Sequence, residues 1–105
     1  MKILFICSRN IWRSATAEAI YKNSQDHEFR SAGTEPSAKV RVSAKSIAWA
    51  DLIFVMEKKH KHRLVDKFPG EMAGKQVIVL DIEDQYQFMN EELIEMIRIS
   101  IDPYL

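Results

Sequence analysis

Four short segments of the chain have the length and residue types of β-strands, and helical patterns separate them. The predicted strands are KILFI (Lys2 to Ile6), EFRSAGT (Glu28 to Thr34), DLIFVM (Asp51 to Met56) and QVIVL (Gln76 to Leu80). The continuous apolar runs are typical of strands that are covered on both faces. Strands that alternate with helices across short loops form βαβ units, so the sequence predicts a parallel sheet with helices on both sides.

The predicted helices follow from apolar residues that recur at helical spacing. The stripes are Ala17, Ile20 and Tyr21 after the first strand, Val40, Ala44, Ile47 and Ala48 before the third, and Met89, Leu93, Met96 and Ile97 near the end. A further, polar helix is expected from Glu57 to Phe68, with PGEMAG as its end.

The composition places limits on the size and the partners of the protein. A chain of 105 residues is long enough for one compact domain and too short for two, so we expect a single domain over residues 1–105. Fifteen basic side chains balance fifteen acidic ones, which gives no overall field for nucleic acid or an anionic membrane. The opening run is too short for a signal peptide or a membrane span, and a single cysteine suits a reducing cytoplasm, which we expect as the location.

The loop after the first strand carries the candidate chemistry. In FICSRNIWRSATAE (Phe5 to Glu18), the only cysteine, Cys7, ends the apolar run, and Arg13 follows where the helix begins. Ligands of such sheets bind beyond the carboxyl ends of the strands. Backbone N–H groups of the loop and the helix N-terminus can converge on a phosphate, Arg13 can hold two of its oxygens, and the positive surroundings favour a thiolate. Cys7 is therefore predicted to be a nucleophile, although a lone cysteine without this context is most often buried packing.

Two more loop residues have roles in this prediction. Asn10 tolerates left-handed backbone angles and suits a sharp turn inside the loop. Ser14 can hydrogen-bond the thiolate or the departing sulfur.

These residues resemble the nucleophile loop of the low-molecular-weight protein tyrosine phosphatases, C-x-x-N-x-x-R-S followed by an A-E pair. The matching positions are Cys7, Asn10, Arg13, Ser14, Ala17 and Glu18. The resemblance continues in SAGT (Ser31 to Thr34), in ADLIFVMEKKHKHRL (Ala50 to Leu64) and in IEDQY (Ile82 to Tyr86), which is similar to the acid loop of the family. The chain is shorter than typical members, mainly between the second and third strands and around the fourth.

The resemblance implies a three-layer α/β sandwich with a four-stranded parallel sheet of order 2-1-3-4 and a phosphate-binding loop after the first strand. It further implies that Cys7 attacks phosphorus, that Arg13 binds the phosphoryl oxygens and that Asp84 is the general acid. Asn10, Ser14 and Ser31 would form a network that shapes the loop. The substrate-binding residues would be Ser8, Arg9, Asn10, Ile11, Trp12, Ser14 and Tyr86.

Three aspartates compete for the role of general acid, which typically contributes ~10²–10⁴-fold to the rate. Asp102 lies in DPYL, similar to the Asp-Pro-Tyr signature of the family, but it follows the last helix, and ~10 residues at ~1.5 Å each carry it ~15 Å from the active edge. Asp84 is preferred because IEDQY keeps the order of the family, with Gln85 in place of proline. Asp81 remains the alternative, as does a purely solvating role for these carboxylates.

Several aromatic and basic residues are open to two interpretations. Tyr86 would line the entrance as an aromatic wall or pack in the core, and Trp12 would flank the pocket or lie beneath the loop. Arg9 stands where the family usually has glycine, which adds positive charge at the rim but puts the usual turn in question. Trp12 also replaces the second loop cysteine of the family, so no neighbouring disulfide can protect Cys7.

The histidines of HKH, His60 and His62, have a spacing that can bind metal. On a helix, however, residues two apart point away from each other and no third ligand is evident, so a solvated basic face is preferred and no metal site is predicted. The neighbouring lysines lack the interleaved aromatics of a nucleic-acid site, although they could assist an acidic phosphopeptide.

The predicted activity is hydrolysis of phosphotyrosine in proteins, or of an aryl phosphate, through a cysteinyl-phosphate intermediate with inorganic phosphate as the product. No cofactor is required. Ile11 fits the phosphatase form of the loop, whereas related protein arginine phosphatases have threonine there. The alternatives are a phosphate- or phosphopeptide-binding module with lost catalysis, a protein arginine phosphatase and, least favoured because it needs more cysteines, an arsenate reductase.

Overall fold

A single parallel sheet forms the centre of the computed structural model, which describes all residues 1–105. Its strands are β1 (Lys2–Cys7), β2 (Glu28–Gly33), β3 (Leu52–Val55) and β4 (Gln76–Val79). They lie in the order β2-β1-β3-β4, and each neighbouring pair is parallel. The α/β class and the predicted strand order are therefore confirmed.

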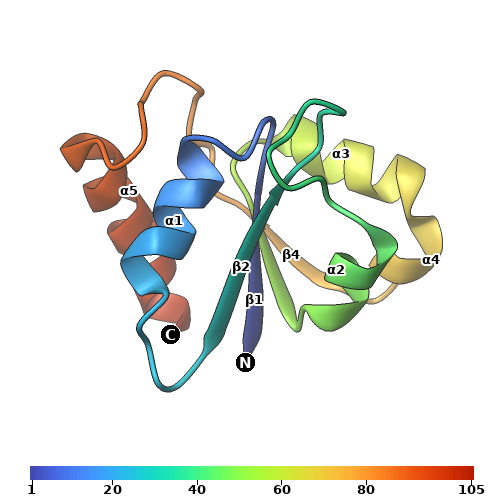
Figure 1. Ribbon diagram of the computed structural model, residues 1–105. Coiled ribbons are helices and arrows are strands. Elements are labelled where there is room, and N and C mark those ends of the chain that lie inside the picture. The colour runs from blue at the N-terminus through green and yellow to red at the C-terminus, as the bar shows by residue number, and fades with distance from the viewer.

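Helices cover both faces of the sheet and complete a three-layer sandwich (Figure 1). They are α1 (Arg13–Tyr21), α2 (Ala44–Trp49), α3 (Lys58–Lys67), α4 (Pro69–Met72) and α5 (Glu91–Ile101), and the 3-10 turn η1 (Asp102–Tyr104) follows α5. Helices α1 and α5 lie on one face of the sheet, and α2, α3 and α4 lie on the other. None of these helices combines the length and the apolar character needed to cross a membrane.

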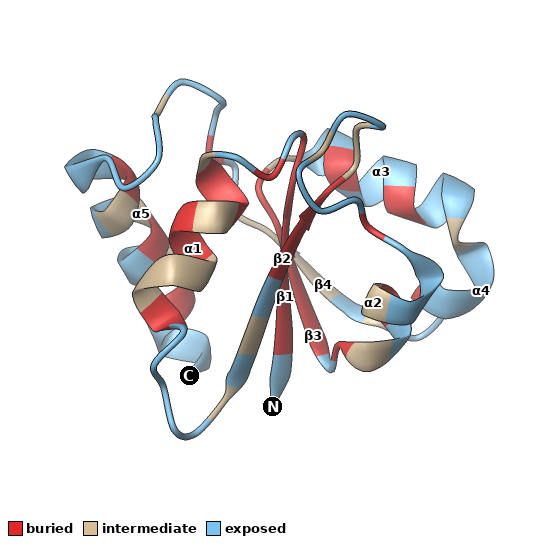
Figure 2. Ribbon diagram, in the orientation of Figure 1, coloured by how far each residue is buried: buried red, intermediate tan, exposed pale blue.

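The alternation of side chains along β1 divides the apolar core into two layers. Ile3, Phe5 and Cys7 belong to the layer beneath α1 and α5, whereas Leu4 and Ile6 belong to the layer beneath α2, α3 and α4. Strands β1 and β3 are the buried centre of the molecule, whereas β2 is buried only in its second half and β4 is only partly buried (Figure 2). Because β1 is covered on both faces, its sequence is a continuous apolar run.

Three helical regions differ from the prediction. Helix α5 begins at Glu91, because the Asn90 side chain caps it by accepting the Leu93 N–H, and Met89 is left outside the helix with a left-handed φ of 62°. Helix α2 begins at Ala44 and leaves Val40 exposed outside it, because Ser43 and Ser46 cap the helix reciprocally through their hydroxyls and backbone N–H groups. The PGEM segment forms the short helix α4 after α3 has ended at Lys67. Pro69 cannot continue the hydrogen bonding of α3, but its fixed φ suits the first position of a new helix.

The parallel arrangement brings the loops after all four strands to one edge of the sheet. The loop that contains Arg9, the segment after Gly33, the start of α3 and the loop between β4 and α5 all meet there (Figure 1). Asp102 lies at the opposite end, as predicted, where its Oδ1 accepts a hydrogen bond from the Tyr21 hydroxyl at 2.5 Å. A ligand site is therefore expected at the edge of the sheet where these four loops meet.

Candidate active site

Cys7 is the last residue of β1, and its sulfur lies at the floor of a pocket. The side chain is buried, yet it contributes to the lining of a small pocket. The Sγ atom lies 2.9 Å from Ser14 Oγ and accepts a hydrogen bond from the Asn10 backbone N–H at 3.2 Å. Donors aimed at the sulfur stabilise negative charge on it, as a nucleophilic thiolate requires.

A buried network of hydrogen bonds shapes the loop from below. Asn10 makes the turn with a left-handed φ of 59°, as predicted, and its amide donates to Ser14 Oγ at 2.8 Å and to Ser31 Oγ at 2.9 Å. Ser31 in turn donates to the carboxylate of Glu18. Because Ser14 Oγ accepts from Asn10, its own hydrogen can be donated either to Cys7 Sγ at 2.9 Å or to the Ala32 carbonyl at 3.4 Å, and the sulfur is the nearer of the two. The predicted association of Asn10, Ser14 and Ser31 is present, and Glu18 extends it.

Arg9 occupies its position without backbone strain. The only residues other than glycine with a positive φ are Asn10, Asp81 and Met89, so the turn does not depend on a glycine at position 9. The segment after β2 supports the outer edge of the loop, since Lys39 N–H donates to the Arg9 carbonyl at 3.0 Å. A Cβ on Gly33 would lie 2.5 Å from the Ser8 carbonyl oxygen, so the close approach of these two segments requires glycine there.

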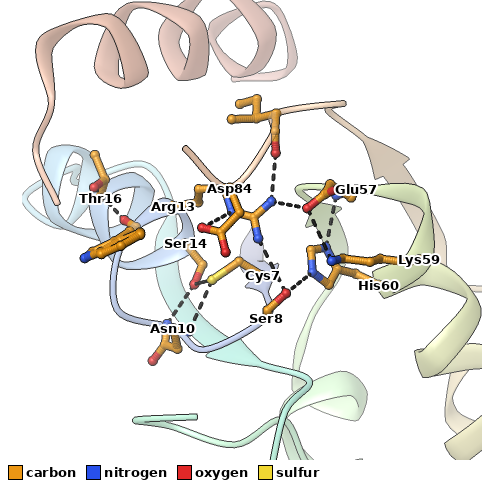
Figure 3. A network of polar contacts seen from close by, with 12 residues as sticks. Cys7, Ser8, Asn10, Arg13, Ser14, Thr16, Glu57, Lys59, His60 and Asp84 are labelled. Atoms are coloured by element: carbon orange, nitrogen blue, oxygen red, sulfur yellow. Dashed lines mark hydrogen bonds and ion pairs between the residues drawn. The ribbon is translucent and has the colours of Figure 1, made fainter. Parts of the chain in front are cut away.

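Arg13 places its guanidinium in the interior beside the pocket (Figure 3). The side chain is 1% exposed, and its Nη1 donates to Glu57 Oε1 at 2.5 Å and to the Ile82 carbonyl at 2.8 Å. Its Nη2 has only a long contact of 3.5 Å to Ser8 Oγ, and its Nε lies 3.6 Å from Asp84 Oδ1. The Nη1 corner is thus anchored, and the Nε and Nη2 edge can bind two oxygens of an anion.

The structure distinguishes the candidate acids by their position. Asp84 lines the pocket together with Cys7, Arg9, Ile11, Trp12 and Arg13. Asp81 instead lines a separate hollow beside the start of α3. Asp84 is the aspartate that shares a pocket with the sulfur.

The structure places the two candidate aromatic residues, Trp12 and Tyr86, in different surroundings. Trp12 lines the pocket, in agreement with the first of its two predicted positions. Tyr86 does not line it: its partly buried ring packs against the core layer beneath α1 and α5. The aromatic wall of the pocket is therefore Trp12.

Comparisons with known proteins agree with this geometry. Residues 2–49 match the family model described as low molecular weight phosphotyrosine protein phosphatase. The resemblance to that family is thereby confirmed. A search of the curated proteins finds no significant match to the sequence.

Solved structures extend the likeness in fold over nearly the whole chain. The low molecular weight protein tyrosine phosphatase SP-PTP of Streptococcus pyogenes has a TM-score of 0.82 at 18% identity, with 99% of this chain and 90% of that chain covered. Wzb of Vibrio vulnificus, solved with benzylphosphonate, has a TM-score of 0.73 at 20% identity, with 96% of this chain and 92% of that chain covered. The YwlE arginine phosphatase of Geobacillus stearothermophilus has a TM-score of 0.64 at 21% identity, with 97% of this chain and 84% of that chain covered. At such identities the likeness concerns the fold, and the chemistry has to be argued from the site.

The prediction of a solvated face is wrong for His60, although it holds for His62, which is exposed. His60 is completely buried in this low molecular weight phosphatase fold. Its Nδ1 accepts a hydrogen bond from the Glu57 backbone N–H at 3.0 Å, so the hydrogen is on Nε2, which donates to Ser8 Oγ at 2.9 Å. Burial, followed by the charge of Arg13, lowers the pKa of His60 to about 4, which keeps the ring neutral.

Glu57 is a second site residue that the sequence did not reveal, because it stands only as the first residue of the predicted polar helix. It is the N-cap residue of α3, and its carboxylate is the main countercharge of Arg13. Burial acts to raise the pKa of Glu57, but the hydrogen bond and the charge of Arg13 outweigh it and hold the pKa below its ordinary value. The available signal was an N-cap residue followed by histidine at the third helical position, because the ring of His60 accepts the backbone N–H of Glu57.

Thr16 is a third missed residue, and it connects helix α1 to the loop that carries Asp84. Its buried hydroxyl donates to the Trp12 carbonyl at 2.6 Å and accepts the backbone N–H of Met89 at 3.0 Å. The other end of the loop is fixed by the Ile82 N–H, which donates to the Met56 carbonyl at 2.8 Å. Asp84 therefore lies on a segment that is anchored on both sides.

Proposed function

We propose that the protein is a cysteine-dependent phosphatase that hydrolyses phosphotyrosine in proteins through a cysteinyl-phosphate intermediate. The single observation that carries this proposal is the convergence of Cys7, Arg13 and Asp84 on one small pocket. A nucleophile, a guanidinium with a free edge and a carboxyl group are the three groups that transfer of a phosphoryl group to a thiolate requires.

In the first step, the thiolate of Cys7 attacks phosphorus while the bond from phosphorus to the ester oxygen breaks. The Nε and Nη2 edge of Arg13 binds two phosphoryl oxygens, and N–H groups of the loop supply further donors. Asp84 gives its proton to the departing oxygen, which leaves as an alcohol or phenol. A proton on Asp84 also removes the repulsion that its carboxylate would exert on an incoming phosphoryl dianion.

In the second step, the carboxylate of Asp84 takes a proton from a water molecule that attacks phosphorus. The sulfur–phosphorus bond breaks, the thiolate of Cys7 is regenerated and inorganic phosphate leaves. The hydroxyl of Ser14, 2.9 Å from Sγ, stabilises the departing sulfur. These two steps return every group to its starting state without a metal or a cofactor. A thiol nucleophile has to stay reduced, which suits the cytoplasm that we propose as the location of the protein.

The depth of the pocket favours phosphotyrosine. The sulfur of Cys7 belongs to a side chain that is 3% exposed, so a phosphoryl group has to reach it on a long, narrow arm. Ile11 and Trp12 provide apolar walls along which an aromatic ring can lie. Phosphoarginine also has a long planar arm, and one structural neighbour is an arginine phosphatase, but the apolar Ile11 fits the form of the loop found in tyrosine phosphatases.

The test is hydrolysis of an aryl phosphate by the wild type and the Cys7→Ser, Asp84→Ala and Asp81→Ala variants. We expect turnover by the wild type, loss in Cys7→Ser and a loss in Asp84→Ala that grows as the leaving group becomes more basic. The same leaving-group pattern in Asp81→Ala would assign the acid to Asp81. Phosphotyrosine and phosphoarginine peptides assayed side by side decide the substrate. Binding of vanadate without any turnover would overturn the enzyme and favour a phosphate-binding module.

A further inference from the structure

Arg9 is a second arginine at the mouth of the pocket, and its charge has no partner. Its side chain is exposed and lines the pocket with Asp84, yet no ion pair of the molecule includes it. The other arginine of the pocket, Arg13, is paired with Glu57, and on the surface Arg63 is paired with Glu35. A guanidinium beside a substrate pocket with all its donors free can bind a further anion.

Lys39 lies next to Arg9 and is also without an ion pair. Its backbone N–H donates to the Arg9 carbonyl at 3.0 Å, which places the two cationic side chains on adjacent backbone segments. Lys39 lines a further, more open hollow together with Ile11 and Phe88. Ile11 lines this hollow and the pocket alike, so the two spaces are neighbours on one surface.

We infer that Arg9 and Lys39 form a subsite for a carboxylate next to the phosphorylated residue, with the adjoining peptide segment on Ile11 and Phe88. This inference rests on the proposed phosphatase function and deepens it, because it names phosphotyrosine within an acidic sequence as the substrate class. Arg9 and Lys39 have no ion-pair partner in the protein, so their positive charges favour a peptide that carries a second negative group beside the phosphate. Ile11 and Phe88 are 36% and 51% exposed, which leaves apolar surface for the peptide to cover.

The position of Arg9 separates this role from binding of the reacting phosphoryl group. The residues that form the cradle itself, Asn10 and Arg13, are 2% and 1% exposed, whereas Arg9 extends into solvent. The one interaction of its backbone with Lys39 does not fix its side chain. Arg9 is therefore a specificity residue, and its contribution depends on whether the substrate carries a second charge.

The test compares two phosphotyrosine peptides that differ only in having glutamate or glutamine beside the phosphotyrosine. For each enzyme the readout is the ratio of kcat/KM for the acidic peptide to kcat/KM for the neutral one. We expect the wild type to prefer the acidic peptide roughly fivefold at low salt, as an exposed ion pair allows, and less at high salt. Arg9→Gln brings the ratio close to one, and Lys39→Gln lowers it by a smaller amount. Lys45→Gln, which removes the same charge from the exposed side of α2, leaves the ratio unchanged.

Two outcomes would overturn the inference. In one, the wild type hydrolyses both peptides equally well; in the other, Arg9→Gln slows both by the same factor, which would assign Arg9 to the phosphoryl group or the loop. If the wild type hydrolyses neither peptide, the proposed function fails, and calorimetric binding of both peptides to the Cys7→Ser variant still decides the subsite. Tighter binding of the acidic peptide, dependent on Arg9, supports it, and equal binding overturns it.

Discussion

Arg13 has a buried positive charge, and in the proposed mechanism only some of its N–H donors bind the substrate. Glu57 and the Ile82 carbonyl fix the Nη1 corner, so the planar group cannot rotate while its other edge binds oxygens. Glu57 also supplies the nearest negative charge when the pocket is empty. At the scale of single residues, the site therefore needs Glu57 for both orientation and charge balance.

Glu57→Gln keeps a hydrogen-bond acceptor but leaves the buried Arg13 without its closest countercharge. We expect the free energy of unfolding in phosphate-free buffer to fall by about 2 kcal/mol, below the value for a fully buried pair because Glu57 is 28% exposed. Millimolar phosphate should restore more stability to the variant than to the wild type, because the bound anion replaces the missing charge. Urea unfolding with and without phosphate measures both effects.

Glu35→Gln is the matched control, since Glu35 pairs with Arg63 on the surface. It is expected to change stability little and to show no special response to phosphate. A Glu57→Gln variant that behaves like Glu35→Gln would contradict the anchoring role of Glu57.

At the scale of elements, the end of β2 and the nucleophile loop are in direct backbone contact. Gly33→Ala would place a methyl group 2.5 Å from the Ser8 carbonyl oxygen and 2.7 Å from Ala38 Cβ. We expect a loss of roughly 1–3 kcal/mol in the free energy of unfolding, as for other overpacked sites, together with lower kcat/KM because the loop is displaced. Denaturant unfolding and aryl phosphate hydrolysis check the two effects.

Gly70→Ala in helix α4 is the control for that prediction. The added methyl group would meet no atom within 4 Å, and alanine is the better helix former. Stability should stay the same or rise slightly, with activity unchanged. Equal behaviour of the two alanine variants would show that the contact at Gly33 is unimportant.

The loop that carries Asp84 depends on its connection to α1 through Thr16. Thr16→Val keeps the shape of the side chain and removes the hydroxyl that accepts the Met89 N–H. Because Asp84 would be held less firmly, we expect kcat to fall several-fold on esters with basic leaving groups and much less on activated esters. Thr16→Ser keeps the hydroxyl and should restore the rate. Equal losses on both kinds of ester would exclude this positioning role for Thr16.

The residues alone predicted those parts of the site that lie on one continuous segment, whereas the assignment of Ser31 and Asp84, on other segments, depended on the resemblance to the family. Cys7, Asn10, Arg13 and Ser14 are within eight positions of one another, and the strand and helix on either side fix their spacing. Glu57 could not be found in this way, because it lies 44 residues from Arg13 and its role depends on the order of the strands. The boundaries of α2, α4 and α5 were also missed, since side-chain caps and a proline decide them rather than the apolar period.

His60 illustrates why burial is difficult to predict on a short polar helix. Charged residues surround it in the sequence, but the first turn of α3 faces the underside of the nucleophile loop, where Ser8 accepts its hydrogen. Tyr86 is the converse case, because a tyrosine in a loop at the active edge packs into the core. In both cases the tertiary structure decides which side of the element is covered.

At the scale of the whole molecule, the neutral state of His60 makes stability depend on pH. Unfolded, its pKa is 6.5, and folded it is about 4, so between these values the unfolded chain binds a proton that the native protein does not. Acid therefore favours the unfolded state, and the free energy of unfolding should fall on the order of 2 kcal/mol as the pH drops through this range. Arg13, Glu57, Lys59 and Arg63 face His60, and of these Glu57 has a lowered pKa. Its carboxyl pKa is 4.5 in the unfolded chain and lower in the folded protein, so its stabilising contribution declines only as the pH falls below about 4.5, at the acid end of this range.

Urea unfolding at several pH values between about 4.5 and 6.5 tests this linkage. The slope of stability against pH should flatten in His60→Asn, whatever the overall stability of that variant. His62→Asn, on the exposed side of the same helix, should keep the slope of the wild type. A slope that survives in His60→Asn would mean that other groups cause it.

The central claim is that phosphate passes through a covalent bond to Cys7, and the most direct measurement is to trap that bond. An activated aryl phosphate is mixed with the Asp84→Ala variant, in which the proton of the attacking water has no acceptor, and the reaction is quenched within its first turnover. Mass spectrometry of the peptide that contains Cys7 should then show one added phosphoryl group, which is absent from Cys7→Ala treated in the same way. Release of the phenol without any phosphorylated Cys7, or undiminished hydrolysis by Cys7→Ala, would contradict the mechanism.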